Sequence, residues 1–257
     1  MAVNVALLQL NSDAAEPAAE RVPRALELTR LATSEADLVV LPEMWVAGAF
    51  DVYGSKDLAQ GLSGPLVNSF RGLAADTNTW LHMGSFAETA DHKLYNTSVL
   101  IAPTGEIAGL YRKRHLFGIG GPEAELLTAG HEFVVVDSPL GSTGLATCYD
   151  LRFPEQFRSL LDLDATAFVM ASGWPESRIT HWQVLLRARA IENQSWVLAC
   201  NGVGQQCGVE LGGRSAIIDP LGNVVAEAGS GEEVLRASID PALAHTCRTE
   251  FPCLQDR

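Results

Sequence analysis

Two kinds of apolar pattern alternate along this chain. Continuous runs such as residues 3–10 and 38–41 are rich in aliphatic and β-branched side chains, which is typical of strands buried on both faces. Between them, residues 17–34 repeat their apolar positions every three to four residues, which indicates a helix. This alternation predicts an α/β fold.

The rest of the chain continues the alternation. The expected strands are residues 80–88, 95–102, 165–171 and 195–201, and the expected helices are residues 66–77, 154–161 and 181–193. Pro154 can begin a helix, because its missing N–H would have no intrahelical partner there. Thr180 is the expected cap of the helix that follows.

Two segments of the chain resemble each other, SVLIAPTGEIAGLY from Ser98 and SAIIDPLGNVVAEA from Ser215. Each places Pro-x-Gly between two apolar runs, which is a turn signal for a β-hairpin. Either they belong to related halves of a pseudo-symmetric sandwich, or they are unrelated hairpins that use common turn residues. Because no low-complexity linker divides the chain, we expect one domain over residues 1–257, with two packed sheets and helices outside them. This is a four-layer α-β-β-α sandwich.

Composition limits the partners that the protein can have. With 257 residues, 47% of them hydrophobic, the chain can bury a substantial core. No stretch approaches the roughly 18 uncharged apolar residues of a membrane helix, and the first residues lack a basic start, so we expect a cytoplasmic protein. A formal net charge of −13 argues against nucleic acid or an anionic membrane as a partner.

The cysteines and histidines give no sign of a metal or a disulfide framework. The five cysteines are an odd number without a CxxC pair, which is typical of a reducing compartment. The six histidines show neither an HxxxH pair nor a His/Cys group at ligand spacing. We expect no metal and no cofactor.

Three reactive residues each stand where an apolar strand ends in a polar turn. Glu43 ends LVVLPEMW, Lys113 lies in YRKRHLF, and Cys148 lies in GLATCYDLRFPE. Reactive groups of α/β proteins gather at the carboxyl ends of strands, so these residues can meet although they are far apart in sequence. A carboxylate, a cation and a thiol together are the chemistry of acyl transfer.

Each group has a role in that chemistry. A free thiol has a pKa of about 8.5, so a base such as Glu43 is needed to take its proton as it attacks a carbonyl. Lys113 is suited to stabilise the developing oxyanion, together with the backbone N–H of Tyr149. Taken singly, Cys148 has the simpler interpretation of a buried small hydrophobe, Glu43 of a surface acid, and Lys113 of one member of a solvated charge run. The combination favours catalysis.

LVVLPEMW, YRKRHLF and TCYDLRFPE, in this order, resemble the three signatures of the nitrilase, or carbon-nitrogen hydrolase, superfamily. The resemblance covers nearly the whole chain, and a Trp-Pro-x-x-Arg-x-x-His-Trp run at Trp174 makes it most similar to the omega-amidase branch. It implies hydrolysis of the terminal amide of a small 2-oxo dicarboxylate monoamide, such as 2-oxoglutaramate, through a cysteine thioester. It also implies a second catalytic glutamate, for which Glu123 is the better match and Glu125 the alternative.

The resemblance further implies that Arg152, Trp174 and Arg178 line the acyl pocket, where a guanidinium can pair with a substrate carboxylate. The simpler interpretation is that Arg152 pairs with Asp150 or Glu155 and that Trp174 belongs to the core.

Three functions remain open: an omega-amidase, another amidase of the superfamily (an N-carbamoyl amino acid hydrolase or an aliphatic amidase), and a non-catalytic interaction protein. Family members of this size usually pair through the helical layer, so we expect a homodimer, with Trp182, Leu185 and Leu186 as its surface. Three glycines in residues 117–122 predict a mobile loop before Glu123.

Overall fold

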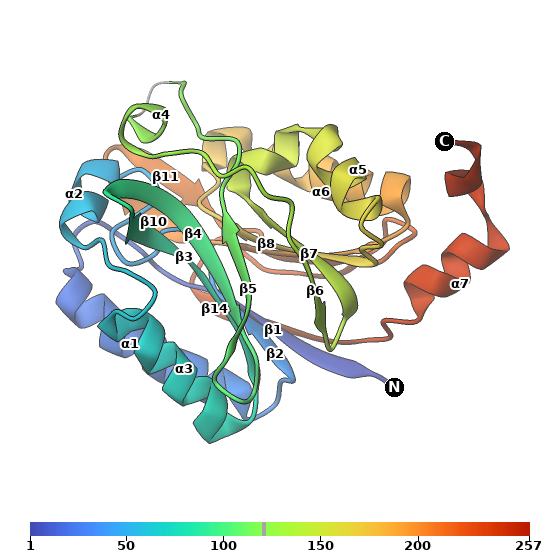
Figure 1. Cartoon of the computed structure of the whole chain (residues 1–257), viewed down its shortest axis with the longest axis horizontal. Helices are drawn as coiled ribbons and strands as arrows, with labels where there is room; N and C mark the ends of the chain where they lie inside the picture. The colour runs from blue at the N-terminus through green and yellow to red at the C-terminus, as the bar shows by residue number, and fades with distance from the viewer. Residues whose placement is uncertain (120–121) are drawn as a thin grey trace.

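The computed structural model describes residues 1–119 and 122–257. Two six-stranded mixed sheets pack face to face, and helices cover both outer faces (Figure 1). The first sheet has the order β14-β1-β2-β3-β4-β5, with β1 (Val3–Gln9), β2 (Leu38–Val40), β3 (Trp80–Ala90), β4 (Lys93–Ile101), β5 (Ile107–Arg112) and β14 (Glu233–Ile239). The second has the order β13-β12-β9-β8-β7-β6, with β6 (Val135–Ser138), β7 (Gly141–Thr147), β8 (Ala167–Ser172), β9 (Trp196–Asn201), β12 (Ala216–Ile218) and β13 (Val224–Glu227).

The helices complete the expected four layers. The first sheet is covered by α1 (Ala18–Thr33) and α3 (Pro65–Thr77), and the second by α5 (Pro154–Leu161) and α6 (Ile179–Asn193). The smaller elements are α2 (Val52–Asp57), α4 (Glu123–Leu126), α7 (Leu243–Glu250) and a two-stranded sheet of β10 (Val203–Gln206) and β11 (Val209–Gly212). The predicted α-β-β-α sandwich is confirmed.

Alternation along the strands divides the core into three apolar layers. In β2, Leu38 and Val40 face the other sheet, whereas Val39 faces α1 and α3. A third layer lies between the second sheet and α5 and α6. Strands buried on both faces explain the continuous apolar runs in the sequence.

The two sheets share one topology. In each, three neighbouring strands are parallel, and the next strand on either side is antiparallel to them. One further strand, β5 or β13, pairs antiparallel with β4 or β12 at the edge. The two Pro-x-Gly segments connect corresponding strand pairs, β4–β5 and β12–β13, and the turn glycines Gly105 and Gly222 have φ of 77° and 83°. The pseudo-symmetric interpretation of the sequence repeat is therefore the better one.

Two expectations about α6 are wrong. The helix begins at Ile179 without a side-chain cap, and Thr180 lies in its first turn, because a 3-10 turn at Glu176–Arg178 leads directly into the helix. Trp182 and Leu186 are fully buried against the second sheet, and Leu185 packs beside them, so these residues do not form an exposed pairing surface. Their helical spacing instead marks the face that the helix buries.

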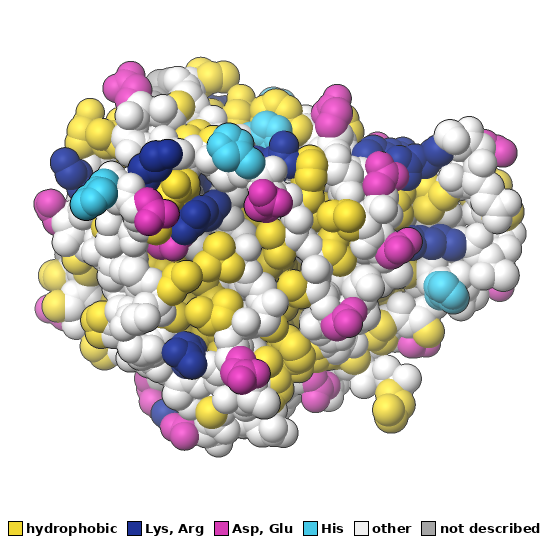
Figure 2. All heavy atoms as spheres, viewed as in Figure 1, with side chains coloured by type: hydrophobic (Ala, Val, Ile, Leu, Met, Phe, Trp, Pro, Cys, Tyr) yellow, Lys and Arg dark blue, Asp and Glu magenta, His cyan; other side chains and the backbone are white. Residues whose placement is uncertain are grey.

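The surface carries a mixture of charges. Figure 2 shows acidic and basic side chains close to one another on one face, with apolar side chains between them. The exclusion of nucleic acid and membrane partners, which rests on the net charge of −13, stays a prediction. Within residues 1–119 and 122–257, no helix has both the length and the apolar character that crossing a membrane requires.

His82 is a buried imidazole in β3, and neither ring nitrogen has a hydrogen-bond partner among the described residues. Burial lowers its pKa to about 4 from the ordinary 6.5. The unfolded chain therefore binds more protons than the folded chain between pH 6.5 and 4, and this group destabilises the fold as the pH falls through that window. A pKa change of this size corresponds to about 3 kcal/mol.

We expect His82→Leu to remove part of the acid sensitivity of the protein. Between pH 7 and 5, urea unfolding should show that the free energy of unfolding falls by about 2 kcal/mol less in this variant than in the wild type. His245→Gln, at an exposed position of α7, is the control and should follow the wild type. Equal pH dependence in His82→Leu and the wild type would contradict the assignment.

Candidate active site

Glu43, Lys113 and Cys148 meet at one cavity although they come from both sheets. Glu43 follows β2, Lys113 directly follows β5 in the same sheet, and Cys148 directly follows β7 in the second sheet. All three line a cavity of about 270 Å³. The strands thus bring together the three residues that the sequence singled out.

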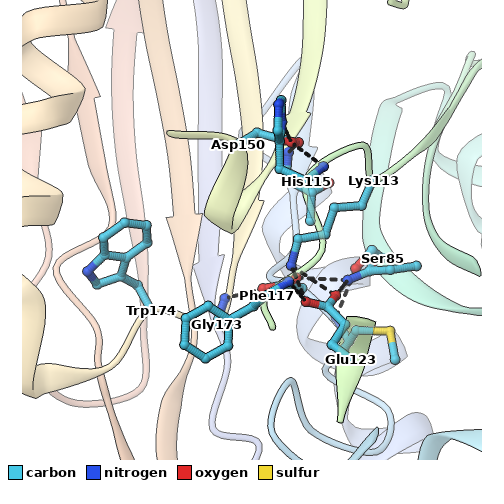
Figure 3. Close-up of polar contacts among 12 residues, drawn as sticks. Ser85, Lys113, His115, Phe117, Glu123, Asp150, Gly173 and Trp174 are labelled. Atoms are coloured by element: carbon cyan, nitrogen blue, oxygen red, sulfur yellow. Dashed lines mark hydrogen bonds and ion pairs between the residues drawn. The ribbon is translucent and has the colours of Figure 1, made fainter. Parts of the chain in front are cut away.

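Lys113 and two carboxylates form a buried charge network (Figure 3). Lys113 Nζ donates to Glu43 Oε1 at 2.7 Å and to the two oxygens of Glu123 at 2.9 and 3.0 Å. Glu123 is buried in α4, whereas the alternative Glu125 is exposed. The structure therefore places Glu123, and not Glu125, beside the lysine.

Charges around the cavity shift the pKa values of Lys113 and Cys148. Burial by itself lowers the pKa of Lys113, but the negative charges of Glu123 and Glu43 outweigh it and raise that pKa well above the ordinary value. Burial and the charge of Glu43 raise the pKa of Cys148 well above its ordinary value, although Lys113 acts in the opposite direction. Cys148 therefore rests as a thiol, and it needs a base as it attacks.

The turn that begins at Cys148 has a strained backbone, which hydrogen bonds to Asp150 stabilise. Cys148 has φ of 44° and begins a 3-10 turn that runs to Arg152. Asp150 accepts the N–H of Thr147 at 2.8 Å, the hydroxyl of Tyr111 at 2.6 Å and a contact of 2.7 Å from His115 Nδ1. A left-handed φ is costly for a cysteine, so this fully buried carboxylate holds the conformation in place.

Glu43 is anchored to the second sheet. Its backbone N–H donates to Ser172 O at 3.3 Å, and its Oε2 accepts the N–H of Gly173 at 2.9 Å. A Cβ at position 173 would lie 2.3 Å from Ala49 Cβ, so only glycine allows this close approach. The contact ties the carboxylate of one sheet to the strand end of the other.

Asn96, on β4, is a site residue that the sequence did not single out. Its Nδ2 donates to Glu43 Oε1 at 2.8 Å and to Glu123 Oε1 at 3.0 Å. The available signal was an amide near the start of the predicted strand 95–102, since a polar group that a strand buries requires partners.

Arg152, Trp174 and Arg178 all line the cavity. The Arg152 guanidinium lies 4.7 Å from the ring centre of Trp174, and the Arg178 guanidinium lies 5.5 Å from that of Phe117. Among the residues that the structure describes, neither guanidinium has a carboxylate within ion-pair distance. Burial and the charge of Arg178 lower the pKa of Arg152, since both guanidiniums line the same cavity.

The simpler interpretations of these residues hold only in part. Asp150 pairs with His115 and not with Arg152, and Glu155 forms no ion pair with Arg152 either. Trp174 is 2% exposed and packs against Trp182, so it belongs to the core as well as to the cavity wall.

Two further expectations from the sequence concern a metal and the loop before Glu123. No group of three or more His, Cys, Asp or Glu side chains in the described part of the chain has the geometry of a metal site. Two of the three glycines that predicted a mobile loop before Glu123, at positions 120 and 121, lie outside the described residues, so that expectation stays a prediction.

Comparisons with known proteins agree with this geometry. The profile of the Carbon-nitrogen hydrolase family matches residues 4–249. The chain is 40% identical over 263 residues to the 2-oxoglutaramate amidase of Paenarthrobacter nicotinovorans, which covers 99% of this chain and 89% of the relative. It is 35% identical over 237 residues to the deaminated glutathione amidase of Dictyostelium discoideum, which covers 85% of this chain and 81% of the relative.

A solved structure has the same fold. Nit3 of Saccharomyces cerevisiae, described as a member of branch 10 of the nitrilase superfamily, superposes with a TM-score of 0.87 at 30% identity, over 98% of this chain and 94% of that one. The profile, the relatives and the fold agree with the strand-end constellation of glutamate, lysine and cysteine. The chain belongs to the carbon-nitrogen hydrolase family.

Proposed function

We propose that this chain is an amidase that hydrolyses the terminal carboxamide of a small 2-oxo dicarboxylate monoamide, such as 2-oxoglutaramate, to the acid and ammonia. The observation that carries this proposal is the pair of guanidinium groups, Arg152 and Arg178, that line the cavity of Cys148 without a carboxylate partner among the described residues. A half-buried cation without a counter-charge favours an anionic ligand. The 2-oxoglutaramate amidase at 40% identity supports the same substrate class.

In the first half of the reaction, Glu43 takes the thiol proton while Cys148 Sγ attacks the amide carbon. The carbonyl oxygen becomes an oxyanion, which the charge of Lys113 and the backbone N–H of Tyr149, one of the first N–H groups of the 3-10 turn, are proposed to stabilise. When the tetrahedral intermediate collapses, the C–N bond breaks. The nitrogen receives the proton from Glu43, and ammonia leaves a thioester behind.

In the second half of the reaction, water attacks the thioester after ammonia has left. Glu43, again ionised, takes a proton from water as the water oxygen attacks the thioester carbon. The C–S bond then breaks, the sulfur regains a proton, and the carboxylic acid product leaves. The same carboxylate serves both halves, as a base in attack and as an acid in leaving-group departure.

The cavity wall selects the acyl group in this proposal. Arg152 and Arg178 pair with the distal carboxylate of the substrate, and binding an anion also relieves the repulsion between the two guanidiniums. The ring of Trp174 holds Arg152 in place by a cation–π contact. A volume of about 270 Å³ suits a small molecule.

A panel of amides tests the substrate. We expect faster ammonia release from 2-oxoglutaramate than from butyramide, glutamine or an N-carbamoyl amino acid, and faster turnover of it than of deaminated glutathione. If wild type prefers butyramide or an N-carbamoyl amino acid, the protein is instead an aliphatic amidase or a carbamoyl hydrolase. Absence of any turnover would favour the non-catalytic interaction protein.

Replacing the pocket arginines tests the recognition. Arg152→Leu or Arg178→Leu should reduce kcat/KM for 2-oxoglutaramate by about 10²-fold, the effect of one lost charge-assisted pair of roughly 3 kcal/mol, with little effect on butyramide. Arg187→Leu is the matched control, since this exposed arginine of α6 bonds Gly222 O outside the cavity. A loss of equal size on both substrates would mean that the arginines only support the fold.

We also propose a single-domain homodimer that works in a cytoplasmic, reducing environment, since catalysis needs a free Cys148 thiol. The pairing surface on α6 has to use its exposed apolar residues, Val184 and Ile191, rather than the buried Trp182 and Leu186. Light scattering that gives the mass of one 27.5 kDa chain would contradict the dimer.

A further inference from the structure

Asn96 closes a ring of four groups beneath the cavity. Its Nδ2 and the Nζ of Lys113 each donate to Glu43 Oε1 and to Glu123 Oε1, at distances from 2.7 to 3.0 Å. The strands fix this arrangement, because Asn96 O accepts the backbone N–H of Lys113 at 2.9 Å across β4 and β5. All four side chains are at least nine-tenths buried.

The amide of Asn96 has only one sensible orientation. Both of its neighbours are carboxylate oxygens that also accept from Lys113 Nζ, so the NH₂ group must face them. As a result, Asn96 Oδ1 is buried without a partner among the described residues. A buried carbonyl without a partner is unfavourable. Its presence here indicates that the two N–H bonds from Asn96 to the carboxylates have a role.

Counting hydrogen bonds shows which oxygen can take a proton. Each carboxylate oxygen has two acceptor positions. In Glu123, Oε1 receives Lys113 and Asn96, and Oε2 receives Lys113 at 3.0 Å and the N–H of Phe117 at 2.7 Å. In Glu43, Oε1 receives Lys113 and Asn96, but from residues 1–119 and 122–257 Oε2 receives only the N–H of Gly173. Within the described residues, Glu43 Oε2 is thus the one oxygen of the two carboxylates with an acceptor position left.

We propose that Asn96 is a positioning residue, which occupies Oε1 of both carboxylates so that the proton from Cys148 goes to Glu43 Oε2. This inference rests on the thiol chemistry of the proposed function. Without the two N–H donors, Glu43 and Glu123 face each other across Lys113 alone, and either Oε1 can take up a proton that leaves the base unable to act. The titratable groups of this ring are Glu43, Glu123 and Lys113. The other titratable groups that line the cavity are Cys148, Asp51, Tyr53, Tyr149, Arg152, Arg178 and Cys207.

Three substitutions at position 96 test this role, because we expect them to reduce activity in a fixed order. Asn96→Ser keeps one donor, Asn96→Ala keeps none, and the isosteric Asn96→Asp puts a third carboxylate in the ring. We expect activity to fall in that order, with kcat of Asn96→Ala reduced by about 10-fold to 100-fold, and KM changed less than about threefold. The acid limb of the pH–rate profile should move up by about one pH unit in Asn96→Ala, since a carboxylate that loses a donor binds a proton more readily.

Asn193→Ala is the matched control. Asn193 is also fully buried, donates one bond to Arg189 O at 2.8 Å and has an Oδ1 without a partner in the described part of the chain, but it lies at the end of α6. Its loss should lower the thermal midpoint without moving the acid limb. Thermal unfolding of the position 96 variants shows whether they fold, and Asn96→Ser provides the readout if Asn96→Ala does not.

This role is wrong if folded Asn96→Ala or Asn96→Ser keeps the wild-type acid limb of the pH–rate profile. It is also wrong if Asn96→Asp is more active than Asn96→Ala. The assay uses whichever amide the wild type hydrolyses fastest. A preference for a neutral amide therefore overturns the proposed substrate and leaves the test of Asn96 intact.

Discussion

Replacing Cys148 by alanine should abolish hydrolysis and leave the fold intact. A methyl group cannot attack a carbonyl, and removing the nucleophile of a catalytic set lowers kcat by about 10⁴-fold or more. Cys148 lines the cavity and is partly exposed, so the shorter side chain leaves no void inside the core. Ammonia release measures the loss, and circular dichroism checks the fold.

The chain offers a matched control for this substitution. Cys207 lines the same cavity and is exposed, but it lies in the turn between β10 and β11, away from the glutamate and lysine network. Cys207→Ala should keep wild-type turnover. Intact-mass and peptide measurements with a slow amide should find the acyl adduct on Cys148; an adduct on Cys207 alone would reassign the nucleophile.

Much of the fold is predictable because its signals are local. The apolar run before Glu43 and the helical period of residues 17–34 each lie within one segment, and the structure reproduces both elements within a few residues. The Pro-x-Gly turns at Gly105 and Gly222 are local too, since a left-handed φ selects glycine. Local chemistry also identified Glu43, Lys113 and Cys148 as a candidate set.

The residues that the sequence missed or assigned wrongly are those whose roles depend on tertiary contacts. The sequence around Asn96 is that of an ordinary strand, and its contacts with Glu43 and Glu123 exist only because β4 pairs with β5 and α4 folds over them. Threonine is a common N-cap residue, but the 3-10 turn before Thr180 already leads into the helix. The apolar period of α6 identified a buried face, and only the packing showed that the second sheet covers it.

Glu43→Gln should lower turnover by about 10²-fold to 10⁴-fold, the effect expected of a general base. The amide keeps the shape of the side chain, but it cannot take the thiol proton or activate water. Lys113→Ala should be nearly inactive as well, because it removes the cation that is proposed to stabilise the oxyanion. Turnover alone therefore does not separate a base from an electrostatic partner.

The reactivity of the thiol does separate them. The charge of Glu43 raises the pKa of Cys148 and that of Lys113 lowers it, so Glu43→Gln should lower this pKa and Lys113→Ala should raise it further. Iodoacetamide reacts with the thiolate, so at pH 7.5 alkylation of Cys148 should be faster than wild type in Glu43→Gln and slower in Lys113→Ala. Peptide mass spectrometry follows Cys148 separately from Cys207.

An inactive Glu43→Gln with a more reactive thiol is a result that only loss of the base explains, because the variant has more nucleophile and still fails to turn over. If Glu43→Gln instead alkylates more slowly than wild type, the carboxylate acts by ionising the resting thiol. If it retains more than about a tenth of wild-type turnover, Glu43 is not the base, since a general base contributes at least about 10²-fold. The saturated Glu123 would be no substitute, because both of its oxygens already accept two hydrogen bonds.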